Sequence, residues 1–279
     1  MLEPYGRDGA VVKLGRRLGE PNLDENRLRT ARRRWAGGQP RAALVLLPGL
    51  DGTDVFFRPL VAALPTWIDP RVVCYPQAGG TSYADLLRLV REATSDVPEM
   101  YILAASFAGP LAMMVAAAEP QRVRGVIFCA SFLRSPQPHL NRVTFVTIAP
   151  VVWTVRALRR LPMWVRRRGD ALRVAKAETW ARASTHGIAA RARAILEVDT
   201  RDLARRCEQP ILCVQFDDDK VVGKAHGEEI ERHAPHATMV TLPGNHLGMF
   251  TTASALAEAV AHFVLTEGRH GRCIPGQRA

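Results

Sequence analysis

From Arg41 onwards, short apolar runs alternate with longer segments whose apolar residues recur at helical spacing. Runs of about five apolar residues indicate buried strands, and a spacing of about three to four residues indicates an amphipathic helix. Strands are predicted at 43–47, 71–75, 101–105, 126–130, 211–216 and 238–242. Helices are predicted at 56–64, 83–93, 111–118 and 253–265. This alternation predicts an α/β fold, a mostly parallel sheet with helices on both faces.

Two parts of the chain depart from this pattern. Residues 1–40 are polar and basic, and we interpret them as a flexible N-terminal extension. Residues 132–208 are helical in character, which predicts a helical cap inserted between the two parts of the core, 41–131 and 209–268. Residues 269–279 are expected to form a C-terminal tail.

The chain of 279 residues carries a net charge of +11, which invites nucleic-acid or anionic-membrane partners. The basic residues are nearly all arginine, however, and we interpret this bias as a consequence of GC-rich coding. No stretch matches a zinc finger, an RNA-recognition motif or another nucleic-acid module. Nucleic-acid binding is therefore not expected.

The cysteines indicate a reducing compartment. They are odd in number and have no metal-ligand spacing, unlike a disulfide framework or a zinc site. The N-terminus lacks the apolar core of a secretory signal. We expect a cytoplasmic protein, and nothing in the sequence implies a metal or a cofactor.

The segment around Ser106 carries the first sign of chemistry. An apolar run, 100–105, leads into this serine, and a helical segment follows. That is the form of a nucleophile elbow, in which a sharp turn presents the serine between a strand and a helix. The tight turn needs small residues two before and two after the serine, and these are Ala104 and Ala108 in place of the commoner glycines. By itself, the segment leaves a catalytic serine and an incidental serine equally open.

A catalytic serine needs a histidine to take its proton and a carboxylate to orient that histidine. Strand 211–216 opens into three consecutive aspartates. Asp219 is the expected acid, because it precedes the return of the chain to the next helix, and Asp218 is the alternative. His246 lies in a glycine-containing loop after strand 238–242 and is the expected base. The three residues come in the order Ser, Asp, His that this kind of sheet requires.

The loop 47–53, Leu-Pro-Gly-Leu-Asp-Gly-Thr, follows an early strand directly. Its two glycines allow a backbone N–H to turn toward a substrate. The expected oxyanion donors are the N–H of Leu50 and the N–H of Phe107, the residue after the serine. Asp51 is interpreted either as ordering this loop or as a solvated carboxylate.

With these four elements the chain resembles the α/β-hydrolase superfamily from about residue 43 to residue 265, apart from most of the cap. It looks most like the small bacterial serine esterases whose elbow is Ala/Gly-Glu-Ser-Phe-x-Gly-Pro, where residues 104–110 are Ala-Ala-Ser-Phe-Ala-Gly-Pro. The loop 47–53, Tyr75-Pro76 and Ser82-Tyr83 match the same group.

This resemblance implies a triad of Ser106, Asp219 and His246, with Leu50 and Phe107 as oxyanion donors. The chain departs from the full eight-stranded fold of this superfamily, because residues 1–40 lack the strands that open it, and we therefore expect a sheet of about six strands.

The expected activity is hydrolysis of a small-molecule carboxylic ester through an acyl-enzyme. An apolar acyl or alcohol group is expected from the cap residues Phe145, Trp153 and Trp164. One alternative is an ester bound to an acidic acyl carrier protein, because the chain resembles the pimeloyl-carrier-protein methyl ester esterases and its stretch 156–168 is basic. An acyltransferase, a thioesterase, a non-catalytic binding protein, and contact of 143–158 with a membrane surface also stay open.

Overall fold

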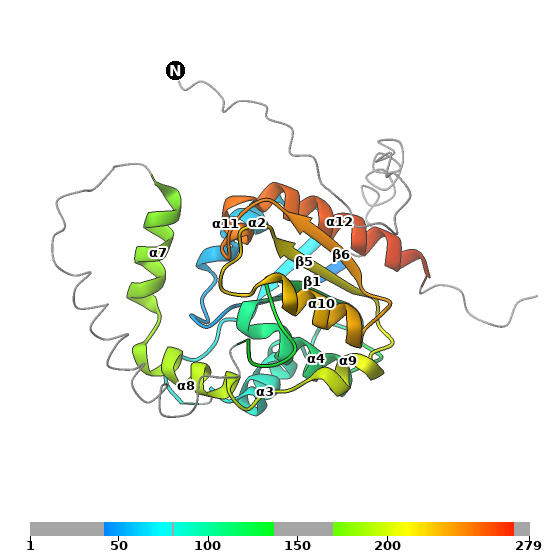
Figure 1. Cartoon of the computed structure of the whole chain (residues 1–279), viewed down its shortest axis with the longest axis horizontal. Helices are drawn as coiled ribbons and strands as arrows, with labels where there is room; N and C mark the ends of the chain where they lie inside the picture. Colours follow the sequence, from blue (N-terminus) through cyan, green and yellow to red (C-terminus); the bar gives the residue numbers. More distant parts are fainter. Residues whose placement is uncertain (1–41, 80, 137–169, 271–279) are drawn as a thin grey trace, which may run out of the picture.

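The computed structural model describes residues 42–79, 81–136 and 170–270. Six strands form one sheet in the order β2–β1–β3–β4–β5–β6, and all neighbouring strands are parallel (Figure 1). The strands are β1 (Ala42–Leu47), β2 (Ile68–Val72), β3 (Met100–Ala105), β4 (Val123–Cys129), β5 (Ile211–Phe216) and β6 (Thr238–Leu242). The parallel six-stranded sheet expected from the sequence is confirmed within these residues.

The helices cover both faces of the sheet. They are η1 (Val55–Phe57), α2 (Arg58–Ala63), α3 (Tyr83–Ala93), η2 (Ser106–Ala108), α4 (Gly109–Ala118), α7 (Ala171–Arg182), α8 (Thr185–Ile195), α9 (Arg201–Arg206), α10 (Lys224–His233), α11 (Gly248–Thr251) and α12 (Ala253–His270). Val45 and Leu47 of β1 pack in one apolar cluster with α3, α4 and α10. Leu44 and Leu46 pack in a second cluster with α2 and α12. Because successive side chains of a strand point to opposite faces, β1 is buried on both.

The strand predicted at 71–75 is wrong by three residues, since β2 spans Ile68–Val72. β2 lies at the edge of the sheet and pairs with a neighbour on one side only. Proline has no N–H, and a strand in this position tolerates its absence. Val73 and Tyr75, whose alternation suggested the strand, are buried beyond it against α3 and α4. Cys74 between them is exposed. At the other end of the chain, α12 runs to His270 and so enters the predicted tail.

Between β4 and β5 the structure describes α7, α8 and α9, part of the segment predicted as a cap. α7 lies to one side of the sheet in Figure 1. α9 packs instead against α4 and α10, in the helical layer beside the sheet. Phe145, Trp153, Trp164 and the basic stretch 156–168 lie outside the described residues. Among the helices that are described, none is long and apolar enough to cross a membrane.

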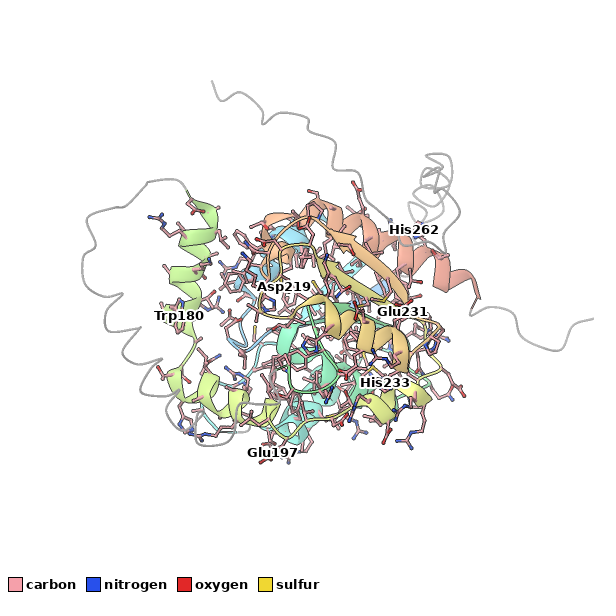
Figure 2. All side chains as sticks on the ribbon, in the orientation of Figure 1. Trp180, Glu197, Asp219, Glu231, His233 and His262 are labelled. Carbon is pink, nitrogen blue, oxygen red and sulfur yellow. The ribbon has the colours of Figure 1, made fainter. Side chains whose placement is uncertain are left out.

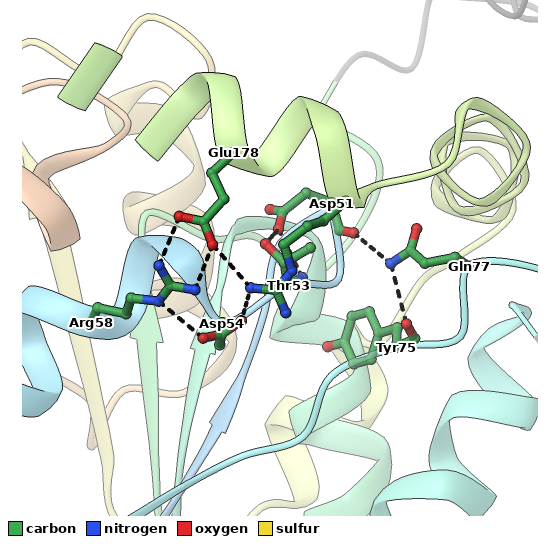
Figure 3. Close-up of polar contacts among 8 residues, drawn as sticks. Asp51, Thr53, Asp54, Arg58, Tyr75, Gln77 and Glu178 are labelled. Atoms are coloured by element: carbon green, nitrogen blue, oxygen red, sulfur yellow. Dashed lines mark hydrogen bonds and ion pairs between the residues drawn. The ribbon is translucent and has the colours of Figure 1, made fainter. Parts of the chain in front are cut away.

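α7 is joined to the body by a group of ion pairs. Arg58 of α2 binds both carboxylate oxygens of Glu178, at 2.8 and 2.6 Å (Figure 3). Arg182 lies 2.6 Å from Asp54, which also binds Arg58 at 3.1 Å. These side chains are partly exposed, so water screens each pair and the group mainly orients α7.

The strand order places the candidate site. The chain passes from β1 outward to β2 and then returns to β3 on the other side of β1. Where the order reverses in this way, the loops after the two central strands run in opposite directions, and ligands of open parallel sheets commonly bind between them at the carboxyl edge. Here those are the loop after β1 and the turn after β3, which begins at Ser106.

Candidate active site

Ser106 is the first residue after β3 and has a φ of +50°, a left-handed conformation that L side chains rarely adopt. Its strained backbone turns the chain sharply from β3 into α4. Gly109 allows this turn to pack closely, because a Cβ there would lie 2.2 Å from the Ser131 hydroxyl and 2.7 Å from the Phe132 carbonyl. The Ser131 hydroxyl donates a hydrogen bond to the carbonyl of Ser106.

The next residue, Phe107, is held by α3. The Tyr83 hydroxyl donates to the carbonyl of Phe107 at 2.9 Å, and the two rings stack with centroids 4.8 Å apart. Ser82 and Asp85 form a capping box that starts α3 and so sets the position of Tyr83. The position of Tyr83 against Phe107 is not predicted from the sequence, although Ser82-Tyr83 is among the pairs on which the resemblance to the esterases rests.

His246 lies between the other two predicted catalytic residues. Its Nε2 is 3.0 Å from the Ser106 Oγ, and its Nδ1 is 2.9 Å from Oδ2 of Asp219. The three side chains come from the loops after β3, β5 and β6, and Figure 2 labels Asp219 among them. The Asp219 side chain is only 2% exposed, whereas that of His246 is 19% exposed. This arrangement can draw a proton from the serine hydroxyl to the imidazole.

Asp219 is held as an anion by its surroundings. Burial opposes its ionisation, but hydrogen bonds from His246 and from the N–H groups of Val222 and Val221 outweigh burial and lower the pKa of Asp219 below 3.8. The two N–H groups lie 2.9 and 2.8 Å from Oδ1. The alternative acid, Asp218, is exposed and lies 3.4 Å from Lys220. The structure therefore puts Asp219 and not Asp218 against His246.

The acid loop and the histidine loop are joined directly. The Asp217 carboxylate accepts a hydrogen bond from the Gly244 N–H at 2.9 Å. The Asp218 N–H donates to the carbonyl of Gly244, also at 2.9 Å. Gly244 has a φ of +134°, which favours glycine. These bonds set the distance between the two loops, and hence between Asp219 and His246.

The loop after β1 contains a tight turn, 49–52, closed by a hydrogen bond of 3.0 Å from the Gly52 N–H to the Gly49 carbonyl. A Cβ on Gly49 would lie 3.7 Å from the Cβ of Ser106, so the loop passes close beside the serine. Leu50, the predicted oxyanion donor, is the next residue. The structure thus brings the turn that carries Leu50 close to Ser106, and Phe107 directly follows Ser106 in the chain.

Asp51 orders this turn. Its carboxylate accepts hydrogen bonds from both the N–H, at 2.8 Å, and the hydroxyl of Thr53 (Figure 3). Burial raises the pKa of Asp51, although these bonds act in the opposite direction. Gly52, with a φ of +70°, leaves no room for a side chain because a Cβ would lie 2.8 Å from that of Tyr75. Of the two interpretations of Asp51, the structure supports the loop-ordering one.

No protein-family model and no curated protein matches the chain. Several solved structures are similar to it. A hydrolase from Pseudomonas aeruginosa PA01 is 23% identical over 80% of this chain and 90% of that one, with a TM-score of 0.66. A bromoperoxidase from Bacillus anthracis is 16% identical over 80% and 92%, with a TM-score of 0.68. An enol-lactonase from Burkholderia xenovorans LB400 is 20% identical over 82% and 93%, with a TM-score of 0.67.

The chain has the α/β-hydrolase fold. At identities this low, the likeness shows the fold alone. The names of the similar proteins also differ, and one fold supports many activities. The activity has to be argued from the site.

Proposed function

We propose that the protein is a serine hydrolase that cleaves carboxylic esters through an acyl-enzyme. The observation that carries this proposal is the position of the His246 imidazole, 3.0 Å from the Ser106 hydroxyl and 2.9 Å from the Asp219 carboxylate. A serine hydroxyl is a weak nucleophile near neutral pH, and an oriented imidazole that accepts its proton makes it reactive.

In the first half of the reaction, the Ser106 Oγ attacks the carbonyl carbon of the ester while Nε2 of His246 takes the hydroxyl proton. Asp219 stabilises the resulting imidazolium through Nδ1. The carbonyl oxygen becomes an oxyanion, for which Leu50 and Phe107 supply N–H donors. When the tetrahedral intermediate collapses, the alcohol leaves with the proton from His246, and the acyl group stays on Ser106.

In the second half, a water molecule attacks the acyl carbon and gives a proton to His246. The second tetrahedral intermediate collapses, the carboxylic acid leaves, and His246 returns the proton to Ser106. The names hydrolase and enol-lactonase among the similar structures support hydrolysis as the reaction type.

The test is labelling with a fluorophosphonate probe, which reacts with activated serines, in parallel with hydrolysis of p-nitrophenyl acetate. We expect the wild type to be labelled at Ser106 and Ser106→Ala to be unlabelled, with hydrolysis reduced by at least about 10³-fold. Ser95→Ala, at an exposed serine beyond α3, is the matched control and should behave as the wild type. Undiminished labelling of Ser106→Ala would overturn the proposal. If the wild type is active and labelled at Ser106, a series of p-nitrophenyl esters of increasing acyl length defines its preferred substrate.

A further inference from the structure

Arg191 of α8 is completely buried, although arginine is among the residues least often buried. It belongs to the segment between β4 and β5, yet its side chain reaches the turn 49–52 beside Ser106. A buried guanidinium is costly unless its donors are satisfied. Its partners therefore indicate what the residue does.

Among the residues that the structure describes, its hydrogen bonds all go to backbone carbonyls. Nε donates to Leu50 at 2.7 Å, and Nη2 donates to Asp51 at 3.2 Å. Nη1 donates to Pro76 at 3.0 Å, and the guanidinium lies 5.8 Å from the centre of the Tyr75 ring. The Asp51 charge also attracts it. The planar fork of arginine carries five donors on three nitrogens in fixed directions, so it reaches carbonyls that lie apart, whereas the three donors of a lysine share one nitrogen.

Two of these carbonyls belong to the central residues of the turn. The Gly52 N–H closes the turn onto Gly49, and the residues between them are Leu50 and Asp51. Arg191 thus restrains both central residues of the turn. The Leu50 N–H shares a planar peptide unit with the Gly49 carbonyl, which the Gly52 N–H holds. The Leu50 and Asp51 carbonyls, which Arg191 holds, belong to the next two peptide units of the same turn. Arg191 therefore acts on the direction of the Leu50 N–H by keeping the whole turn closed.

A second contact connects α8 to the same turn. Gln77 donates from Nε2 to the carbonyl of Asp51 at 3.1 Å and to that of Tyr75 at 3.3 Å (Figure 3). Its Oε1 accepts from the N–H of Ser184 at 2.8 Å, and the Ser184 hydroxyl donates to its backbone carbonyl. Ser184 is the N-cap of α8. The start of α8 and its second turn are therefore both bonded to the segment around Leu50.

The contrast with Arg182 indicates that Arg191 does more than attach α8 to the body. Arg182, at the end of α7, pairs with the carboxylate of Asp54 near the surface. Exposed pairs of that kind can dock a helix without burying a charge. Arg191 is buried and donates to the carbonyls of the turn 49–52, which approaches the serine. In this turn, a small rotation of one peptide unit changes the direction of the Leu50 N–H.

We propose that Arg191 is a positioning residue, which holds the turn 49–52 in the shape that points the Leu50 N–H at the carbonyl oxygen of the substrate. This inference rests on the proposed ester hydrolysis. If Arg191 has this role, the rate of the reaction depends on how α8 packs against the turn 49–52. Without the guanidinium, the turn can rotate, and the oxyanion of both tetrahedral intermediates loses one donor for part of the time.

The test compares Arg191→Met, which keeps the length of the side chain but removes its donors, with Arg193→Met, an exposed arginine on the same helix. The enzyme concentration is taken from the number of sites labelled by the fluorophosphonate at completion, so that unfolded protein is not counted. We expect kcat of Arg191→Met for p-nitrophenyl acetate to fall by about 10²-fold, because removal of one oxyanion donor costs about 10²–10³-fold. KM should change by less than about threefold, and Arg193→Met should match the wild type.

The deciding measurement is inhibition by a trifluoromethyl ketone, which forms a tetrahedral adduct with the serine and places an oxyanion where the substrate would. Its affinity should fall in Arg191→Met by about the same factor as kcat. A residue that only stabilised the fold would lower the melting temperature and the number of labelled sites, with kcat per site and inhibitor affinity unchanged. That result would overturn the inference.

Arg191→Lys covers the case in which the methionine variant does not fold. The lysine keeps the charge but lacks the fork, so we expect kcat per site and ketone affinity to fall together by at least about tenfold. Wild-type values in Arg191→Lys would overturn the inference and leave the hydrolase proposal intact. A wild type that neither hydrolyses esters nor labels at Ser106 would instead overturn the proposed function, and the inference with it.

Discussion

Replacing Asp219 by asparagine exchanges one carboxylate oxygen for an amide NH₂ and changes little else in size. In the wild type, Oδ1 accepts hydrogen bonds from the backbone N–H groups of Val221 and Val222, and in the productive tautomer Oδ2 accepts a hydrogen bond from Nδ1–H of His246. An asparagine has only one oxygen, which can accept either from the two backbone N–H groups or from Nδ1–H of His246. The structure predicts which of these partners it takes.

If the amide oxygen keeps the two backbone bonds, the NH₂ faces Nδ1 of His246. The imidazole must then accept at Nδ1 and carry its proton on Nε2, which lies 3.0 Å from the Ser106 Oγ. In that tautomer it cannot take the proton of the serine. The opposite orientation keeps the productive tautomer but leaves both backbone N–H groups facing an NH₂.

The Val221 N–H is exposed and can bind water, whereas the Val222 N–H is partly buried. Leaving a buried donor unsatisfied costs about 1–3 kcal/mol, so the Val222 N–H disfavours the productive orientation by about that amount. At about 1.36 kcal/mol for each tenfold change, we expect Asp219→Asn to lower kcat by roughly 5-fold to 150-fold. Initial rates of p-nitrophenyl acetate hydrolysis and the rate of fluorophosphonate labelling both measure this loss. The control is Asp218→Asn, which removes only an exposed carboxylate 3.4 Å from Lys220 and should stay within about twofold of the wild type. If Asp219→Asn kept more than about a third of the wild-type rate, or if Asp218→Asn were the slow variant, this reasoning would be refuted.

Two further predictions concern stability. Gly109→Ser puts a Cβ 2.2 Å from the Ser131 hydroxyl, so we expect it to lower the free energy of unfolding by about 1–3 kcal/mol. In the control Gly223→Ser, the Cβ meets nothing within 4 Å and should change the free energy of unfolding by less than about 0.5 kcal/mol. Equal melting temperatures for the two variants would contradict the packing argument. Since the pKa of Asp219 is lowered in the folded protein, its ionised form adds stability that is present above pH 3.8 and lost as the pH falls through the folded pKa. Urea unfolding of the wild type and Asp219→Asn at pH 7 and pH 3 should therefore give a smaller difference at pH 3, and an unchanged or larger one would disprove this.

The elements that sequence analysis predicted well are those with local signals. Helix α3 has the predicted bounds, 83–93, because its apolar periodicity coincides with a capping box at Ser82. Strands β5 and β6 also have the predicted bounds, since each is a short run rich in apolar and β-branched residues that ends at a turn-forming residue, Asp217 or Pro243. β2 was misplaced because Asp69 and Pro70 interrupt its apolar pattern. Only its position at the edge of the sheet makes those residues acceptable there.

The candidate catalytic residues were also accessible from sequence, because each follows a strand at the same edge of a parallel sheet. Once the strands are recognised, their carboxyl ends must meet, and Ser106, Asp219 and His246 are brought to that edge. The choice between Asp218 and Asp219 was weaker, since neighbouring loop residues differ only in where their side chains point. The distance of 2.9 Å between Asp219 and His246 makes that distinction.

The sequence by itself determined the order of strands and helices, the sharp turn at Ser106 and the presence of an acid and a base after later strands. These features depend on local periodicity and on small residues at fixed spacing. Only the tertiary structure distinguished Arg191 from Arg193, two arginines in one helix with the same kind of neighbours. The difference arises because α8 docks on a turn about 140 positions earlier in the chain, which buries one guanidinium against Leu50 and leaves the other exposed. Contacts between segments so far apart depend on how complete elements pack, and no local pattern records them.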